Sequence, residues 1–158
     1  FDPHELMRID QTLLPDMGMD IPLVQLVART DWQLTQVQTA DGQWVNYDYD
    51  WMLAPGAMAK IAQYAEGVGP HIGMLTANPP AAVNPSDAAT AQLPVLNGLV
   101  TEAQRQGLAV HPYTVRADRL PRGIASLDAL HQWLFDEAGV DGVFTDFPDR
   151  AVQYLKRD

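Results

Sequence analysis

The chain has no cysteine among its 158 residues, so a disulfide, a thiolate zinc site and a cysteine nucleophile are all excluded for this sequence. Basic residues are also scarce. Ten lysines and arginines stand against 20 aspartates and glutamates and give a formal net charge of −10. Such a charge repels phosphate groups at long range, so neither nucleic acid nor an anionic membrane surface is expected as a partner.

Long apolar runs are absent as well. No run approaches the roughly 20 residues that a membrane-spanning helix needs, so no membrane span is expected. No basic and then apolar signal segment opens the sequence. The first residue is Phe1 rather than Met, and it reads as the end of a strand that leads into a helix capped by Asp2 and started by Pro3. We therefore expect a trimmed chain or a part of a longer protein.

Short apolar strands alternate with helices along the sequence. The pattern predicts helices at 4–14, 56–66, 87–106, 126–138 and 149–157, and strands at 22–27, 67–75, 108–115 and 142–146. This order is typical of parallel βα units. Periodicity alone leaves open whether the strands form half of a barrel or a small open sheet. Residues 28–55 show no sustained period and are expected to form a long loop insertion.

Functional groups in parallel α/β folds lie at the carboxyl ends of the strands. Four such places occur here, at Phe1, in the stretch 28–55, at 113–118 and at 146–149. An aspartate between a strand and a helix is ordinarily a helix cap, so Asp2 and Asp146 are expected to be structural rather than catalytic.

The stretch 28–55 is rich in aromatic residues, with acidic residues beside them. The aromatic residues are Trp32, Trp44, Tyr47, Tyr49 and Trp51, and the acids are Asp41, Asp48 and Asp50. Two interpretations stay open, a pocket for a cationic group and a small core of the loop's own. The histidines show neither HxH nor HExxH spacing, so a metal site complete within this chain is not expected.

Two motifs in order carry a resemblance to a known family. The stretch "GLAVHPYTVR" and, some 30 residues later, "GVDGVFTDFPD", together with the leading Phe-Asp-Pro, strongly resemble the C-terminal half of the glycerophosphodiester phosphodiesterase family. The aromatic insertion makes the sequence most similar to the periplasmic bacterial member. The similarity runs over essentially the whole chain.

The resemblance implies an α/β fold in which residues 1–158 form the C-terminal half of a TIM (β/α)8 barrel, with parallel strands alternating with helices. It implies a hydrolase of glycerol and lipid metabolism that cleaves glycerophosphodiesters, the deacylated phospholipids, to glycerol 3-phosphate and an alcohol. It also implies a divalent metal, usually calcium, and a periplasmic location.

Three family motifs map onto this sequence. Phe1 matches the Phe of a Gln-Ser-Phe motif, and Tyr113 to Val115 match a Trp-Thr-Val-Asn motif in which Arg116 replaces the Asn. Gly142, Thr145, Asp146 and Pro148 match the third motif, Gly-(Ile/Val)-Thr-Asp and the proline beyond it. The family's catalytic histidines and metal-binding carboxylates belong to its N-terminal half and have no counterpart here. The resemblance thus implies that this chain holds no catalytic residue and no metal ligand, and that the metal is bound by the missing N-terminal half.

The expected contribution of this chain is to substrate binding. Phe1, Tyr113 and Phe147 are expected to form a wall against the glycerol carbons, and the loop with Trp44 and Trp51 is expected to cover the alcohol. A half-barrel leaves open sheet edges and an apolar face, so the missing N-terminal half-barrel or a second copy in a homodimer is the expected partner, and the chain alone should be inactive. The alternatives are a non-catalytic half-barrel that serves in binding or assembly, and an unrelated open-sheet domain.

Overall fold

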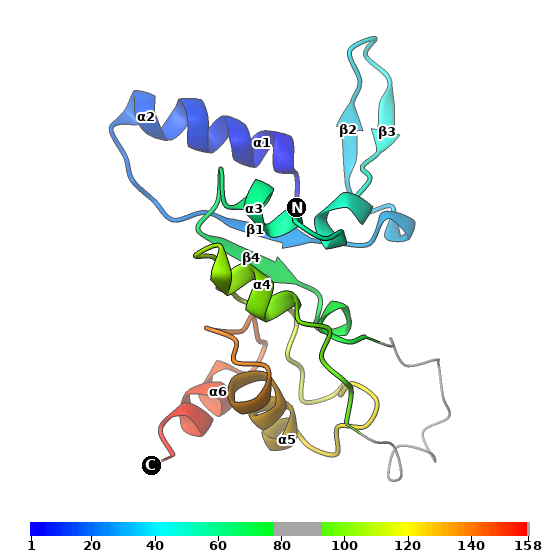
Figure 1. Cartoon of the computed structure of the whole chain (residues 1–158), viewed down its shortest axis with the longest axis vertical. Helices are drawn as coiled ribbons and strands as arrows, with labels where there is room; N and C mark the ends of the chain where they lie inside the picture. The colour runs from blue at the N-terminus through cyan, green and yellow to red at the C-terminus, as the bar shows by residue number, and fades with distance from the viewer. Residues whose placement is uncertain (78–92, 158) are drawn as a thin grey trace. The chain divides into compact units, whose positions relative to one another are not determined.

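The computed structural model describes residues 1–77 and 93–157 (Figure 1). The chain divides into two compact units, Phe1–Gly69 with Glu102–Ala109, and Pro70–Thr101 with Val110–Asp158. The helices are α1 (Pro3–Arg8), η1 (Ile9–Leu13), α2 (Leu14–Met17), η2 (Thr30–Trp32), η3 (Asp50–Leu53), α3 (Ala57–Ile61), η4 (Ile72–Leu75), α4 (Leu99–Arg105), α5 (Leu127–Gln132), η6 (Trp133–Glu137) and α6 (Pro148–Leu155). The strands are β1 (Val24–Val27), β2 (Gln36–Gln38), β3 (Trp44–Asn46), β4 (Gly67–Pro70) and β5 (Ala109–Val110).

Strands β1, β4 and β5 form one sheet in that order. The arrows of β1 and β4 point the same way in Figure 1. In the second unit, parallel bridges join His71 to Tyr113 and Val115 to Thr145. The prediction of an α/β fold with parallel strands is confirmed. The assignment of residues 1–158 to half of a barrel stays a proposal.

The predicted strands are shorter than expected: β1 and β4 cover Val24–Val27 and Gly67–Pro70 instead of 22–27 and 67–75, and the two later strands are reduced further beside Pro112. Strand β5 covers Ala109–Val110 instead of 108–115, and the segment 142–146 contributes a bridge at Thr145 instead of a regular strand. Pro112 has no N–H to donate, so the ladder cannot continue through it. The segments still lie side by side, since the Phe144 N–H donates to the Pro112 carbonyl and the Val115 N–H donates to the Phe144 carbonyl, each over 2.9 Å.

The predicted helix at 87–106 is wrong over residues 93–98, which are not helical. Helix α4 begins at Leu99, whose N–H donates to the Asn97 side chain over 3.1 Å. Gly98 has φ +84°, a left-handed conformation that breaks a helix and favours glycine. The part of this prediction at 87–92 lies outside the described residues.

The stretch 28–55 is not an irregular loop. Strands β2 and β3 pair antiparallel with Val37 opposite Val45, and they form a hairpin that projects away from β1 (Figure 1). Its turn contains Asp41 and Gly42, and Gly42 has φ +83°. An Asp-Gly pair between short strands is a hairpin signal. The sequence therefore indicated this hairpin, and the prediction of an irregular loop missed it.

In the first unit, helix α1 has a side-chain cap, and strand β1 has one buried face and one partly covered face. The Asp2 carboxylate accepts hydrogen bonds from the N–H groups of His4 and Glu5 over 3.0 and 3.2 Å, which confirms the predicted cap. On β1, Gln25 and Val27 are fully buried whereas Val24 and Leu26 are only partly covered. The side-chain oxygen of Gln25 (Oε1) accepts a hydrogen bond from the Tyr64 hydroxyl, so this buried polar atom has a partner.

The second unit is built around α5 and η6. The Ser126 hydroxyl caps α5 by accepting from the Ala129 N–H. Four apolar residues of α5 and η6 are buried at helical spacing: Leu127, Leu130, Trp133 and Leu134. None of the helices in the described ranges is long and apolar enough to cross a membrane.

Candidate functional site

In the first unit, the predicted site residue Phe1 is tied to the aromatic stretch. Its carbonyl accepts a hydrogen bond from the Tyr49 hydroxyl over 2.6 Å, while its own side chain is 46% exposed. The Tyr49 hydroxyl also lies 2.7 Å from the Thr35 hydroxyl. Phe1 is therefore held by its backbone and leaves its ring accessible.

Tyr47 and Tyr49 belong to a packed aromatic group. Their rings meet edge to face with centroids 4.9 Å apart, and the His4 ring meets Tyr47 at 5.6 Å. The Trp51 indole N–H donates to the Tyr47 hydroxyl over 2.8 Å. Burial raises the pKa values of both tyrosines, so their hydroxyls stay neutral at ordinary pH. For these two residues the contacts favour a small core of the stretch's own over a pocket for a cation.

The two predicted tryptophans lie in different surroundings. Trp44 begins β3 on the hairpin and is 66% exposed. Trp51 lies on η3, and the Lys60 ammonium lies 5.9 Å from its ring centroid. This ring is thus already beside a cation from the chain itself. Contact of either residue with a substrate stays a prediction.

In the second unit, Tyr113 lies beside a histidine that the motif did not indicate. The Tyr113 N–H donates to the Pro70 carbonyl over 3.0 Å, and the Tyr113 carbonyl accepts from the Ile72 N–H over 2.9 Å. This pairing brings the His71 and Tyr113 rings to 5.7 Å, edge to face. The His71 Nδ1 accepts from the Gly73 N–H, so a neutral His71 carries its proton on Nε2. The shared position of the two residues at the ends of neighbouring strands is the signal that would have found His71.

Arg116 is the centre of a small ion-pair group. Its guanidinium makes two hydrogen bonds to Asp118, of 3.0 and 2.7 Å, and lies 3.4 Å from Asp146. The hydrogen bond from Arg116 holds the pKa of Asp118 below its usual value. Asp146 is therefore an ion-pair partner rather than the helix cap that was predicted, because α6 starts only at Pro148 with Phe147 as its N-cap residue. Asp149 lies in the first turn of α6, as expected.

The backbone before Phe147 is fixed by Thr145. The Thr145 hydroxyl donates to the Val115 carbonyl over 2.9 Å and accepts from the Phe147 N–H over 3.0 Å. The Tyr113–Thr114 peptide bond is cis. Tyr113 and Phe147 thus both stand on segments that hydrogen bonds hold in place.

The described residues do not gather a metal-ligand set. In residues 1–77 and 93–157, no three side chains of His, Asp or Glu come together as a bound metal would require. The side chains present therefore do not fit a metal site of their own.

Comparison with known proteins gives consistent results. The family described as "Glycerophosphoryl diester phosphodiesterase family" matches residues 1–150. A protein of Haemophilus influenzae named glycerophosphodiester phosphodiesterase is 47% identical over 99% of this chain, and one of Treponema pallidum with the same name is 40% identical over 98%. The chain spans 41% of the length of each of these relatives.

Proposed function

Because the chain belongs to the glycerophosphoryl diester phosphodiesterase family, we propose that it supplies part of an enzyme that hydrolyses glycerophosphodiesters to glycerol 3-phosphate and a free alcohol. The observation that carries this proposal is the match to the family over residues 1–150, together with relatives of that name that align with almost the entire chain. The two sequence motifs fall within the matched range. Since the chain spans 41% of these relatives, the activity is proposed for the longer protein.

The proposed role of this chain is in substrate binding. Phe1, Tyr113 and Phe147 would pack their rings against the glycerol carbons and limit the access of water. The hydrogen bonds to the backbones of these residues support the proposal, because a held backbone allows a ring to present a fixed surface. Trp44 and Trp51 would cover the alcohol that leaves.

Catalysis would come from residues outside this chain. The two histidines that act as general acid and base, and the carboxylates that bind a divalent ion such as calcium, are proposed to lie in the N-terminal part of the longer protein. No step of the reaction is assigned to a metal held here.

A closed barrel explains why the two parts would need each other. Parallel strands with open edges require a partner, so we propose that this chain is the C-terminal half of a TIM barrel that pairs with the N-terminal half. A homodimer of the chain is the alternative pairing. A periplasmic location is part of the same proposal.

The test compares the purified 158-residue chain with the full-length protein, using glycerophosphocholine and calcium. We expect release of glycerol 3-phosphate by the full-length protein and none by the chain alone. Turnover by the chain would contradict its proposed inactivity. Binding of glycerophosphocholine by the full-length protein without turnover would contradict the enzyme and support a non-catalytic binding or assembly module.

A further inference from the structure

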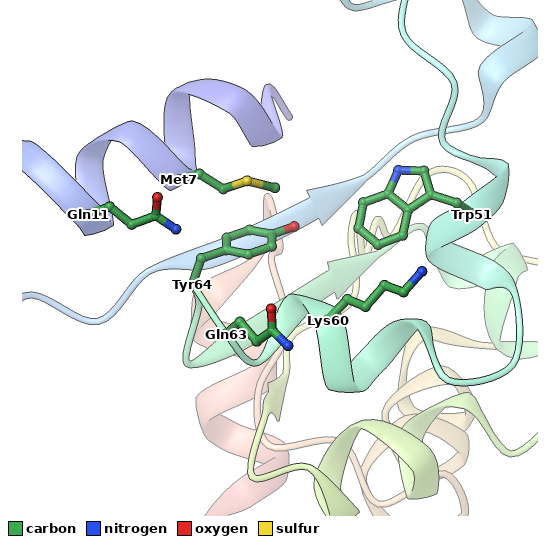
Figure 2. A pocket seen from close by; sticks show the side chains of 6 residues that line it. All are labelled: Met7, Gln11, Trp51, Lys60, Gln63 and Tyr64. Carbon is green, nitrogen blue, oxygen red and sulfur yellow. The ribbon is translucent and has the colours of Figure 1, made fainter.

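A pocket of about 570 Å³ lies in the first unit, and none of the residues that line it belongs to either sequence motif. Its walls come from α1 and η1, from η3, from α3, and from Gln63 and Tyr64 shortly after α3 (Figure 2). The residues that line it are Met7, Gln11, Trp51, Lys60, Gln63 and Tyr64. Its volume is within the range of about 300–1,000 Å³ that small-molecule sites occupy.

The two aromatic walls of this pocket are fixed, and their polar atoms are already used. The Trp51 indole N–H donates to Tyr47, and the Tyr64 hydroxyl donates to the Gln25 carbonyl oxygen over 3.2 Å. Tyr64 is only 4% exposed, and burial raises the pKa of its hydroxyl. The partly exposed Trp51 ring and Met7 thioether therefore offer apolar surface to an occupant, and the Tyr64 ring adds only its small exposed part.

The pocket also has a single charge. Lys60 is the one charged residue among the six that line it, and it forms no salt bridge within the part of the chain that the structure describes. Gln11 and Gln63 add carboxamide groups, which can donate or accept hydrogen bonds. In a chain with a formal charge of −10, an accessible cation without a carboxylate partner marks a place where an anion is favoured over a cation.

We propose that this pocket is a binding site for a small organic anion with an apolar body. The anionic group would pair with Lys60 and accept hydrogen bonds from Gln11 or Gln63, and the apolar body would lie against Trp51, Met7 and Tyr64. The proposal does not depend on the proposed phosphodiesterase activity, because it concerns binding and is tested without turnover.

Calorimetric titration of the full-length protein with 4-phenylbutyrate and with 4-phenylbutan-1-ol tests the proposal. These probes share the apolar body and differ in charge. We expect the carboxylate to bind with a Kd near or below about 1 mM, and the alcohol to bind at least about tenfold more weakly. Equal affinities, or no heat of binding from the carboxylate up to its solubility limit, would overturn the proposal.

Variants of the two lysines assign the binding to the pocket. Lys60→Gln should raise the Kd of 4-phenylbutyrate about tenfold, whereas Lys60→Arg should largely retain binding. Lys156→Gln is the matched control, since Lys156 is the other lysine of these 158 residues and the charge change is the same. An equal loss of affinity for 4-phenylbutyrate in both glutamine variants would contradict binding at this pocket. If Lys60→Gln does not fold, added NaCl provides the second measurement, because it should weaken binding of the carboxylate and leave the alcohol unchanged.

Discussion

The ring of His111 lies so close to Gly142 that a methyl group on Gly142 would come within 2.9 Å of the His111 Cδ2 and Nε2 atoms. The same ring meets Phe144 edge to face at 6.2 Å. At Gly142, the second glycine of "GVDGVFTDFPD", the His111 ring packs closely against the backbone. This packing requires a residue without a side chain at position 142.

Gly142→Ala should therefore destabilise the protein by about 1–3 kcal/mol, the usual cost of overpacking, because the His111 ring must move. Urea unfolding of the variant measures this cost. The His111→Ala background provides the control, since removing the ring should abolish most of the penalty. An equal cost in both backgrounds would show that the ring is not the obstacle.

The buried His131 predicts a loss of stability in acid. Its two ring nitrogens have no hydrogen-bond partner among the described residues, and burial lowers its pKa, with the nearby Asp128 opposing that shift. An unfolded histidine has a pKa of about 6.5, so the unfolded state takes up the proton first. The contribution of this group is complete above about pH 6.5 and decreases as the pH falls below it.

Urea unfolding at pH 7.5 and pH 5.0 should show this decrease in the wild type and a smaller one in His131→Phe. His4→Gln is the matched control, because it removes a histidine at an exposed position on α1. The same acid dependence in His131→Phe as in the wild type would exclude His131 as its source.

Removal of the first helix cap should have a measurable cost. Asp2→Ala deletes the acceptor of two backbone N–H groups of α1 and should lower the free energy of unfolding by about 1 kcal/mol. Asp20→Ala, at an exposed position beyond α2, removes the same charge without a cap. The idea fails if the two variants lose the same stability.

Trp44 and Trp51 allow a test of headgroup recognition. If these residues cover the alcohol, Trp44→Ala and Trp51→Ala in the full-length enzyme should change kcat/KM for glycerophosphocholine and glycerophosphoglycerol by different factors. Leu34→Ala is the control, since Leu34 is 69% exposed in the same stretch and is not one of the residues predicted to contact substrate. Equal effects on both substrates would count against recognition of the headgroup.

Local signals in the sequence were sufficient for the class of fold and for most helix starts. Asp2 and Ser126 act as caps, and the apolar face around Leu130 is buried as its spacing predicts. The strand limits were missed because periodicity registers side chains and not the missing N–H of Pro112. The helix start at Leu99 depends on the Asn97 side chain and the left-handed Gly98, which outweigh the apolar spacing before them.

The candidate site was predictable only in part. The motifs identify Phe1, Tyr113 and Phe147, but the neighbour of Tyr113 is His71, which lies over 40 positions earlier and meets it through strand pairing. Asp146 looked like a cap and is instead paired with Arg116, because α6 starts two residues later. No pattern in the sequence indicated Lys60 as a binding residue. Its candidacy depends on the neighbouring Trp51 ring, which only the fold brings beside it.

The hairpin of β2 and β3 has a practical consequence for labelling. Its turn, Thr39 to Gln43, is closed by its own hydrogen bonds, and Ala40 to Gly42 lie at a tip bounded by two paired strands. Exposed tips of this kind tolerate insertions better than most positions of a folded chain. A fluorophore or a short affinity tag placed at Ala40 would therefore report on the protein while leaving the sheet, the aromatic group and the pocket at Lys60 intact.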